Sequence, residues 1–567
     1  MKSIKKISAL ALLGFALALT SCGGNNGGDN TSASSSAVSG GTITNDDLSK
    51  GVTEYKDANG NTQKLTRSQL YANAGNPHVN SYPTNGKKQK LLVAPIKFTK
   101  NAKDEKDTIE ANDELLERIR ITFTGTQEEI DKVGGTISVK SFYEQSSFNK
   151  GAFDVVMIPT WIDFGETAKE FEKSSGGNAG VSAAERVRTW YIAEYKKENH
   201  GSLGADAYSL DDLDSDDDGF IDLIWNVYAY PYDSGDTSFW WAYVTYTGNA
   251  AGSLTAPTVQ TLAWASTNFL SEGSKGYESR TFIHETGHTL GMDDYYDYNK
   301  EWSPAGGIDY MDQNLGDHNS YSKFAYGWVN PWVLKEEDLS GNKTAEITLR
   351  LATTSGDCLV LASPNYNNTA FDEYLMVELA GPYGLCKKDY LNEGLNKFGI
   401  RVWHIDARAT SSKSYAEEEV FSTPDEVGQK AFDLRNDNSK FGRGKDGDYW
   451  TTSAGAKRSY SQISLLEASW DSKTNAQTNT TYKASTSSWF RKNSTFSLKG
   501  DGASRATMYM PSQSSLWNKA KKITNKSKLK QEYTIDDTMT CDYSFRVSSI
   551  VEDDTYGAVA TIKVTLI

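Results

Sequence analysis

Apolar and polar positions follow two different patterns along the chain, and the change comes near residue 340. Between residues 86 and 335, short apolar runs typical of buried strands alternate with longer segments of helical spacing. The predicted strands are 90–98, 153–158 and 222–228, and the predicted helices are 107–123, 183–197 and 277–292. Strands that alternate with helices predict an α/β domain over residues 86–335.

After residue 340, long helical patterns become scarce. The chain shows short alternating runs separated by turn residues. These runs are 346–351, 374–378, 399–404, 463–466 and 559–567. They predict a β-rich C-terminal module of sandwich or jelly-roll type over residues 340–567.

The first fifty residues are organised differently. Lysines at positions 2, 5 and 6 precede an apolar stretch, 7–19, which is too short to span a membrane and is typical of a signal-peptide core. It ends in Leu19-Thr20-Ser21-Cys22, which resembles the processing site of bacterial lipoproteins. We therefore expect a signal peptide at 1–21 and a lipid on Cys22, which would place the protein in the cell envelope, facing outside the cytoplasm. An ordinary signal peptide with an incidental cysteine is the alternative.

Two polar segments follow the cysteine. Residues 22–50 are rich in Gly, Ser and Asn and predict a flexible tether. Residues 51–85 contain Gly-Asn and Asn-Pro pairs and predict an irregular N-terminal segment. An inhibitory pro-region is one interpretation of this second segment.

Composition narrows the class of protein. The chain has 567 residues, 38% of them hydrophobic, which indicates a globular protein of two or three domains. Its formal net charge of -15 argues against nucleic acid as a partner, because binding phosphates needs clustered Lys and Arg. If Cys22 carries lipid, Cys358, Cys386 and Cys541 remain. An odd number of thiols implies no disulfide framework, although a Cys358–Cys386 pair stays open.

One short segment carries metal-binding chemistry: His284-Glu285-Thr286-Gly287-His288. On a helix, residues four apart share a face, so both imidazoles can reach one ion, and neutral imidazole suits Zn²⁺. Glu285 is placed to act as the general base on a zinc-activated water. Two solvated histidines on a surface helix are the alternative.

The third ligand is predicted from the residues that follow. Gly291 can end the helix and turn the chain back, so that Asp294 reaches the ion three residues later. Three protein ligands with one open position make a catalytic zinc site. Asp293 and the downstream Glu301 remain alternatives.

Met311 and Tyr310, which follow the zinc motif in the chain, are weaker candidates for functional residues. Met311, within Gly306-Gly307-Ile308-Asp309-Tyr310-Met311-Asp312, is predicted to form a tight turn below the metal. Tyr310 is a candidate for stabilising the oxyanion. Core packing is the alternative for the methionine.

A second motif predicts a structural calcium ion. Asp214, Asp216, Asp218 and Asp222 stand at positions 1, 3, 5 and 9 of a loop with Gly219 at position 6. Position 12 is Trp225 rather than Glu, so the loop is not an EF-hand. The alternative is a solvated acidic turn.

Among the remaining histidines, His404 is interpreted as structural. We expect solvated or satisfied surface positions for His78, His200 and His318.

Taken together, these segments resemble the immune inhibitor A type of secreted bacterial metallopeptidases over residues 86–567. The matching segments, in order, are 90–98, 138–148, the Asp-rich loop into 222–228, the zinc motif, 310–312, 321–328, 373–378 and 399–406. The resemblance implies a zincin-type α/β domain with zinc on His284 and His288, an acidic third ligand best matched by Asp294, and Glu285 as the catalytic base. It also implies hydrolysis of peptide bonds in extracellular proteins. One departure is Asp293, where the family usually has Pro.

Two other functions remain open at this stage. The aromatic-rich C-terminal module is compatible with a surface lipoprotein that binds glycans or proteins on a zincin scaffold. The same zinc chemistry is also compatible with hydrolysis of a non-peptide amide or ester.

Overall fold

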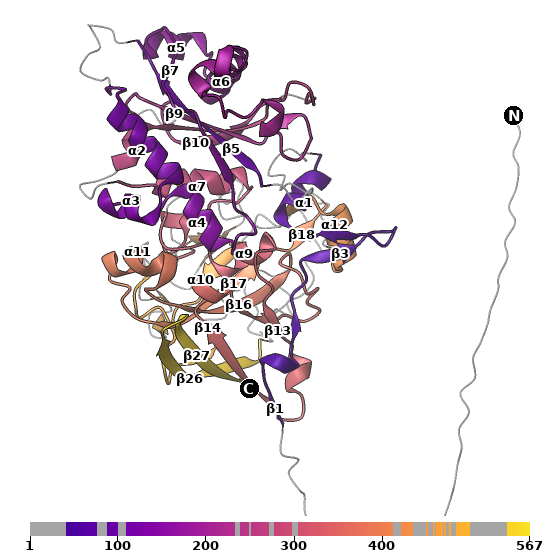
Figure 1. Cartoon of the computed structure of the whole chain (residues 1–567). Helices are drawn as coiled ribbons and strands as arrows, with labels where there is room; N and C mark the ends of the chain where they lie inside the picture. The colour runs from indigo at the N-terminus through magenta and orange to yellow at the C-terminus, as the bar shows by residue number, and fades with distance from the viewer. Residues whose placement is uncertain are drawn as a thin grey trace, which may run out of the picture. The chain divides into compact units, whose positions relative to one another are not determined.

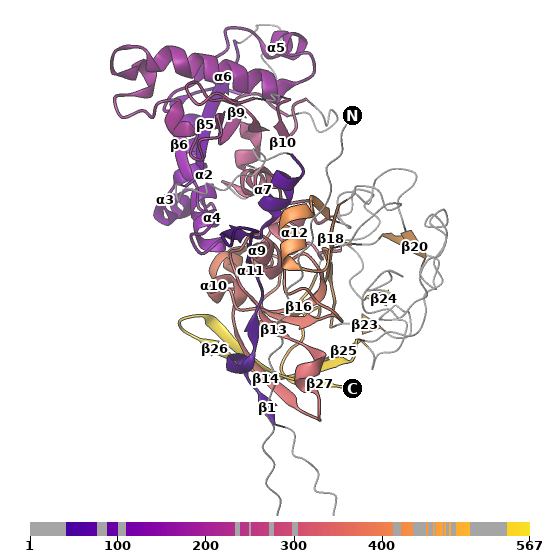
Figure 2. The same cartoon turned by 90° about the vertical axis from the view of Figure 1, so that its right-hand side faces the viewer.

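The computed structural model shows a mixed α/β fold with several sheets (Figures 1 and 2). It describes residues 41–75, 88–99, 109–232, 239–248, 251–271, 277–296, 304–411, 421–434, 449–451, 457–459, 461–468, 470–471, 476–477, 484–498 and 541–567. The predicted signal peptide, Cys22, most of the tether, His78 and Glu301 lie outside these residues. Within them, no helix is long and apolar enough to cross a bilayer.

The first large sheet contains the strands predicted from the apolar runs. Its order is β10-β12-β9-β5-β6, with β7 also paired to β5. The strands are β5 (Lys90–Lys97), β6 (Asp154–Met157), β7 (Ile162–Asp163), β9 (Leu223–Tyr228), β10 (Tyr243–Tyr246) and β12 (Thr261–Ser266). All pairs are parallel except that of β10 with β12, so β10 forms an antiparallel edge.

Helices cover both faces of this sheet because the side chains of β5 alternate between two cores. Leu92, Ala94 and Ile96 pack against α5 (Ala168–Ser174) and α6 (Ala179–Tyr195). Leu91 and Val93 face the core that contains α2 (Asp113–Thr124), α4 (Val139–Ser146) and α7 (Arg280–Thr289). The predicted helices are confirmed, with ends shifted by a few residues.

Two further sheets are built largely by the second half of the chain. One has the order β2-β13-β15-β16-β17-β22, and the other β1-β14-β27-β26-β25. The first comprises β2 (Ser49–Lys50), β13 (Trp332–Leu334), β15 (Leu359–Ala362), β16 (Glu373–Ala380), β17 (Gly399–Asp406) and β22 (Ile463–Leu465). The second comprises β1 (Thr42–Ile43), β14 (Thr344–Arg350), β25 (Thr495–Ser497), β26 (Tyr543–Asp553) and β27 (Gly557–Leu566). Apolar residues of both sheets form one shared core, and the five predicted strands are confirmed.

The prediction for the N-terminal segment is wrong for the part that the structure describes. The last residues of the expected tether form β1, the 3-10 helix η1 (Asn45–Asp47) and β2, and they pair with β14 and β13. The expected irregular segment contains a hairpin, β3 (Glu54–Lys56) with β4 (Thr62–Lys64), and the helix α1 (Arg67–Asn73). These strands are too short and too polar to leave a pattern, and β1 and β2 take partners about 300 residues away.

The zinc-motif region and the C-terminal strands share a core and buried charges. Phe371 and Trp403 belong to the same apolar cluster as Tyr143 and Phe324. Glu378 in β16 accepts hydrogen bonds from the main-chain and side-chain donors of Ser320. The boundary predicted between residues 335 and 340 therefore falls inside one packed body, residues 40–567.

Candidate metal centre

The helix α7 carries the zinc motif and packs against β10 and β12. Its C-terminus closes with two hydrogen bonds, from Gly291 N to His288 O (2.9 Å) and from Met292 N to Gly287 O (3.1 Å). This is the Schellman pattern, which needs a left-handed residue after the cap, and Gly291 has φ of +83°. The predicted role of Gly291 is thus confirmed, and the chain reverses immediately before Asp294.

His284, His288 and Asp294 converge as the spacing predicts. One ligand atom from each lies within 4.8 Å of the others. Asp294 Oδ1 is 3.0 Å from His284 Nε2 and 3.2 Å from His288 Nε2. Tetrahedral ligands about 2.0–2.1 Å from an ion lie roughly 3.3 Å apart, so small adjustments accommodate Zn²⁺. The donor set, two imidazoles and a carboxylate, is one that zinc prefers.

The second nitrogen of each imidazole is occupied. His284 Nδ1 lies 2.7 Å from the carbonyl oxygen of Tyr310, and His288 Nδ1 lies 2.7 Å from that of Met292. A carbonyl only accepts, so Nδ1 carries the proton and Nε2 is the nitrogen left to bind a metal. Both rings are therefore oriented before any ion arrives.

The charges of the centre are strongly coupled. Burial disfavours the charged form of His288, but the Asp294 carboxylate outweighs this and raises the pKa of His288 to about 10. Burial also acts to lower the pKa of His284, but the hydrogen bond and charge of Asp294, together with the charge of Glu285, outweigh it, so this pKa is raised. Burial acts to raise the pKa of Asp294, but the two imidazoles lower it well below its usual range. The metal-free site thus holds protons where a cation would bind, and metal binding releases them.

Glu285 is positioned beside the two ligands on the same helix. It is buried, with 8% of its surface exposed, and burial raises the pKa of its carboxyl against the opposing effect of His288 and His284. The side chain of His288 is 22% exposed, so the centre is open to solvent on that side. A carboxylate with a raised pKa next to an open metal position is suited to accept and return a proton.

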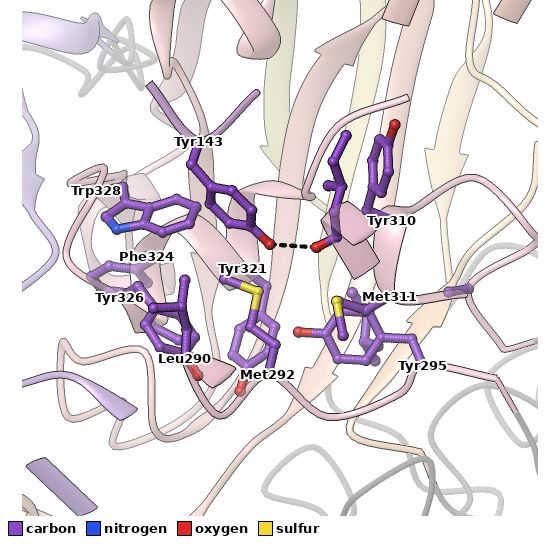
Figure 3. Packing of buried hydrophobic residues seen from close by; sticks show 14 of the residues in the cluster. Tyr143, Leu290, Met292, Tyr295, Tyr310, Met311, Tyr321, Phe324, Tyr326 and Trp328 are labelled. Atoms are coloured by element: carbon purple, nitrogen blue, oxygen red, sulfur yellow. Dashed lines mark hydrogen bonds between the residues drawn. The ribbon is translucent and has the colours of Figure 1, made fainter. Parts of the chain in front are cut away.

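The residues below α7 explain the helical glycine. A Cβ on Gly287 would lie 2.6 Å from Met311 Sδ and 3.2 Å from Tyr143 Oη. Met311, in α8 (Tyr310–Gln313), packs with Met292 and Tyr295 (Figure 3). The Tyr143 hydroxyl donates to the carbonyl of Ile283 at 2.7 Å, drawn as the dashed line in Figure 3. The structure thus places Met311 against α7 at Gly287, and its role in a turn below a metal stays a prediction.

The oxyanion role suggested for Tyr310 finds no support in the geometry. Its ring is 1% exposed and lies 4.3 Å from the ring of Phe142. Burial raises its pKa well above the usual value, and the nearby charges that contribute most are those of Asp389 and Arg280. Tyr310 contributes to the centre through its main-chain carbonyl, which a side-chain pattern cannot predict.

Another tyrosine lies at the rim of the centre. The Tyr246 hydroxyl, on edge strand β10, donates to the main-chain carbonyl of His288 at 3.1 Å, and the residue is 38% exposed. Sequence analysis missed it, since nothing in the sequence marks a strand tyrosine some forty residues before the motif.

The structure distinguishes between the two adjacent candidates for the third ligand, Asp293 and Asp294. Asp294 joins the histidines, whereas Asp293 faces away, and its Oδ2 lies 3.5 Å from Nη2 of Arg67. Glu301 falls outside the described residues.

The acidic loop is only partly assembled as predicted. Asp214, Asp216 and Asp218 come together, with carboxylate oxygens within 4.8 Å of one another. Asp222 is not in this group. Its carboxylate accepts hydrogen bonds from Lys90 N (2.5 Å), Ser215 N (2.9 Å) and Ser215 Oγ (2.5 Å), so it ties the loop to β5. A calcium ion in this loop stays a prediction.

The other histidines and the thiols occupy structural positions. His404 Nε2 pairs with Glu373 at 2.9 Å, in agreement with a structural role, and His200 stacks on Tyr195.

The expectation for His318 is wrong. It is 2% exposed among the rings of Phe142, Tyr143, Tyr310 and Trp328, and neither ring nitrogen has a hydrogen-bond partner among the described residues. The free thiols Cys358, Cys386 and Cys541 are buried, so the open Cys358–Cys386 pair does not form.

Comparison with models of known protein families and with curated protein sequences finds no match.

Proposed function

We propose that this protein is an exported, lipid-anchored zinc metallopeptidase. The convergence of His284, His288 and Asp294 around one point, with Glu285 beside them, carries the proposal. On this proposal the parallel sheet with α7 is a zincin-type catalytic domain, and the two C-terminal sheets form a β-sandwich. The lipid on Cys22 would hold the enzyme at a membrane, where it meets extracellular proteins or peptides.

The chain's own residues supply most of the chemistry. His284, His288 and Asp294 would hold zinc, which as a Lewis acid makes water a better nucleophile and polarises a carbonyl. Glu285 would take up the proton that the attacking water loses and pass it to the departing amine, because its carboxyl lies beside the two histidines of the same helix. The carbonyls of Tyr310 and Met292 keep both imidazoles in the tautomer that this requires.

The edge strand beside α7 favours a peptide as substrate. Among the described strands, β10 pairs only with β12, so its other edge can pair with an extended chain. Such pairing reads the main chain of a peptide, which glycans and simple esters lack. Tyr246, in this strand, contacts the carbonyl of His288 and so links the edge to the metal centre.

A binding lipoprotein on the same scaffold is the second candidate. It would need no carboxylate in the position of Glu285, and the buried, metal-adjacent Glu285 therefore favours catalysis. A zinc hydrolase acting on a non-peptide amide or ester would use the same centre and differ only in its substrate.

The decisive experiment measures zinc content and hydrolysis of casein and fluorogenic peptides by protein that begins at residue 41. We expect one zinc per chain and cleavage that a chelator abolishes and added zinc restores. Stoichiometric zinc without cleavage of any peptide would favour the binding lipoprotein. Cleavage of esters alone would favour a zinc hydrolase that acts on a non-peptide substrate. Absence of zinc binding would overturn the proposal.

A further inference from the structure

The helix α1 connects two regions that lie far apart in the sequence. Asn73 Nδ2 donates to the carbonyls of Gly428 and Ala431, each at 2.8 Å, at the C-terminal end of α12 (Pro424–Lys430). At the same time the Tyr71 hydroxyl donates to the carbonyl of Gly291 at 3.4 Å. Figure 1 shows α1 beside α12. The helix is thus fixed on one side to the C-terminal half and on the other to the turn that carries the metal ligand.

Arg67 makes the second contact between α1 and this turn. Its side chain is 4% exposed, and its Nη2 lies 3.5 Å from Oδ2 of Asp293, whose side chain is 14% exposed. The guanidinium also lies over the ring of Tyr71, 4.5 Å from the ring centroid. Its Nε and Nη1 make no hydrogen bond within the described residues, so the ion pair with Asp293 is its main polar contact there. The charge of Asp433 in β19 (Asp433–Leu434) acts on it as well.

Arg67 is a cationic partner for Asp293, which is adjacent to the candidate ligand Asp294. Asp293 and Asp294 are adjacent carboxylates on one short turn, and either is chemically suited to a divalent cation. A largely buried carboxylate is stabilised by a cationic partner, and a metal ion held by the adjacent Asp294 would be an alternative partner to Arg67. With Arg67 in place, Asp293 is directed toward α1 and Asp294 toward His284 and His288.

We propose that Arg67 is a positioning residue of the metal centre, which holds Asp293 away from the ion and so fixes Asp294 as the third ligand. This inference rests on the proposed zinc site. It also gives the segment before β5 a role in assembling the centre, in contrast to the inhibitory role considered from the sequence.

The test measures zinc affinity by competition with a chromophoric chelator, in wild type, R67A, D293N and the double variant R67A/D293N. We expect R67A to weaken zinc binding about 10- to 100-fold, the range typical of residues that orient metal ligands. D293N alone should bind like wild type. The double variant should recover most of the lost affinity, because it has no second carboxylate to compete.

A matched control separates positioning from general charge balance or packing. The double variant R67A/D433N also removes a carboxylate whose charge acts on Arg67, that of Asp433, but it leaves Asp293 in place. It should bind zinc as weakly as R67A. Equal recovery in both double variants, or none in either, would overturn the proposal.

Two further outcomes are distinguishable. If wild type binds zinc but R67A binds it equally tightly, the positioning role is wrong and the proposed function stands. If wild type binds no zinc, the proposed function itself fails. Circular dichroism in chelator verifies the fold of each variant, and R67Q, which keeps most of the side-chain volume, repeats the test if R67A does not fold.

Discussion

His284 Nδ1 lies 2.7 Å from the main-chain carbonyl of Tyr310, so a residue 26 positions later fixes the orientation of the first candidate metal ligand. The carbonyl belongs to the turn that also places Met311 under Gly287. One short segment therefore sets both the tautomer of the imidazole and the packing beneath its helix.

Replacing Glu285 with Gln should separate metal binding from catalysis. The amide cannot take up a proton, so we expect peptide cleavage to fall by about 10²–10⁴-fold, the usual contribution of a general base. Zinc content should stay at the wild-type level, because Glu285 is not among the converging ligands. Peptide hydrolysis and metal analysis on the same sample measure both. Glu185→Gln, on the partly exposed face of α6, is the matched control and should keep full activity. Full activity in the Glu285 variant would contradict its assignment.

Asn substitution at the two adjacent aspartates should give opposite results. Asp294→Asn removes the negative ligand between the two imidazoles, and we expect zinc affinity to fall by more than about 100-fold. Asp293→Asn removes a carboxylate that faces Arg67, and affinity should change little. Chelator competition measures the two dissociation constants. The reverse order of effects would make Asp293 the ligand.

Gly287→Ala should destabilise the protein although alanine is the better helix former. The new methyl group would meet Met311 Sδ at 2.6 Å in a buried site. Overpacking costs about 1–3 kcal/mol and helix propensity returns about 1 kcal/mol, so we expect a net loss of about 1 kcal/mol in the free energy of unfolding. Urea denaturation measures it. In a Met311→Ala background the same substitution should be neutral or stabilising, and a loss there would point to a different cause.

Asp222 should make stability depend on pH. Burial raises the pKa of its carboxyl to about 7 in the folded protein, above the value near 4 expected in the unfolded chain. Between these values the folded state holds a proton that the unfolded state lacks. The contribution of Asp222 is therefore present below pH 4 and is lost as the pH rises through about 7. Relative to Asp222→Asn, the unfolding free energy of wild type should fall by up to about 1.4 kcal/mol per pH unit across this range. Parallel pH profiles in urea denaturation would show that the shift is absent.

Local patterns in the sequence predicted the regular elements well. The alternation in β5, the spacing in α7 and the glycine at its end are local signals, and each element forms where it was expected. The convergence of His284, His288 and Asp294 was predictable for the same reason, because eleven residues of sequence and helical geometry suffice to bring these candidate ligands together.

The features that the sequence did not reveal depend on distant contacts. β1 and β2 consist of two residues each, and they are strands only because β14 and β13 lie beside them. His318 is polar by type, but four aromatic rings from α4, α8 and the turn after α9 (Ser320–Ala325) enclose it. The partnership of Arg67 and Asp293 spans 226 positions and leaves no local trace.

The N-terminal strand has a mechanical consequence for a chain held by a lipid on Cys22. Any pull along the tether would enter the folded body at β1, which runs parallel to β14. Asn45, in η1, makes two hydrogen bonds with Thr348 of β14: Asn45 Nδ2 donates to Thr348 O (3.0 Å), and Thr348 N donates to Asn45 Oδ1 (2.8 Å). The load would thus be borne as shear along the C-terminal sheet. The strands that take this load belong to a different sheet from β10 and β12, which pack against α7.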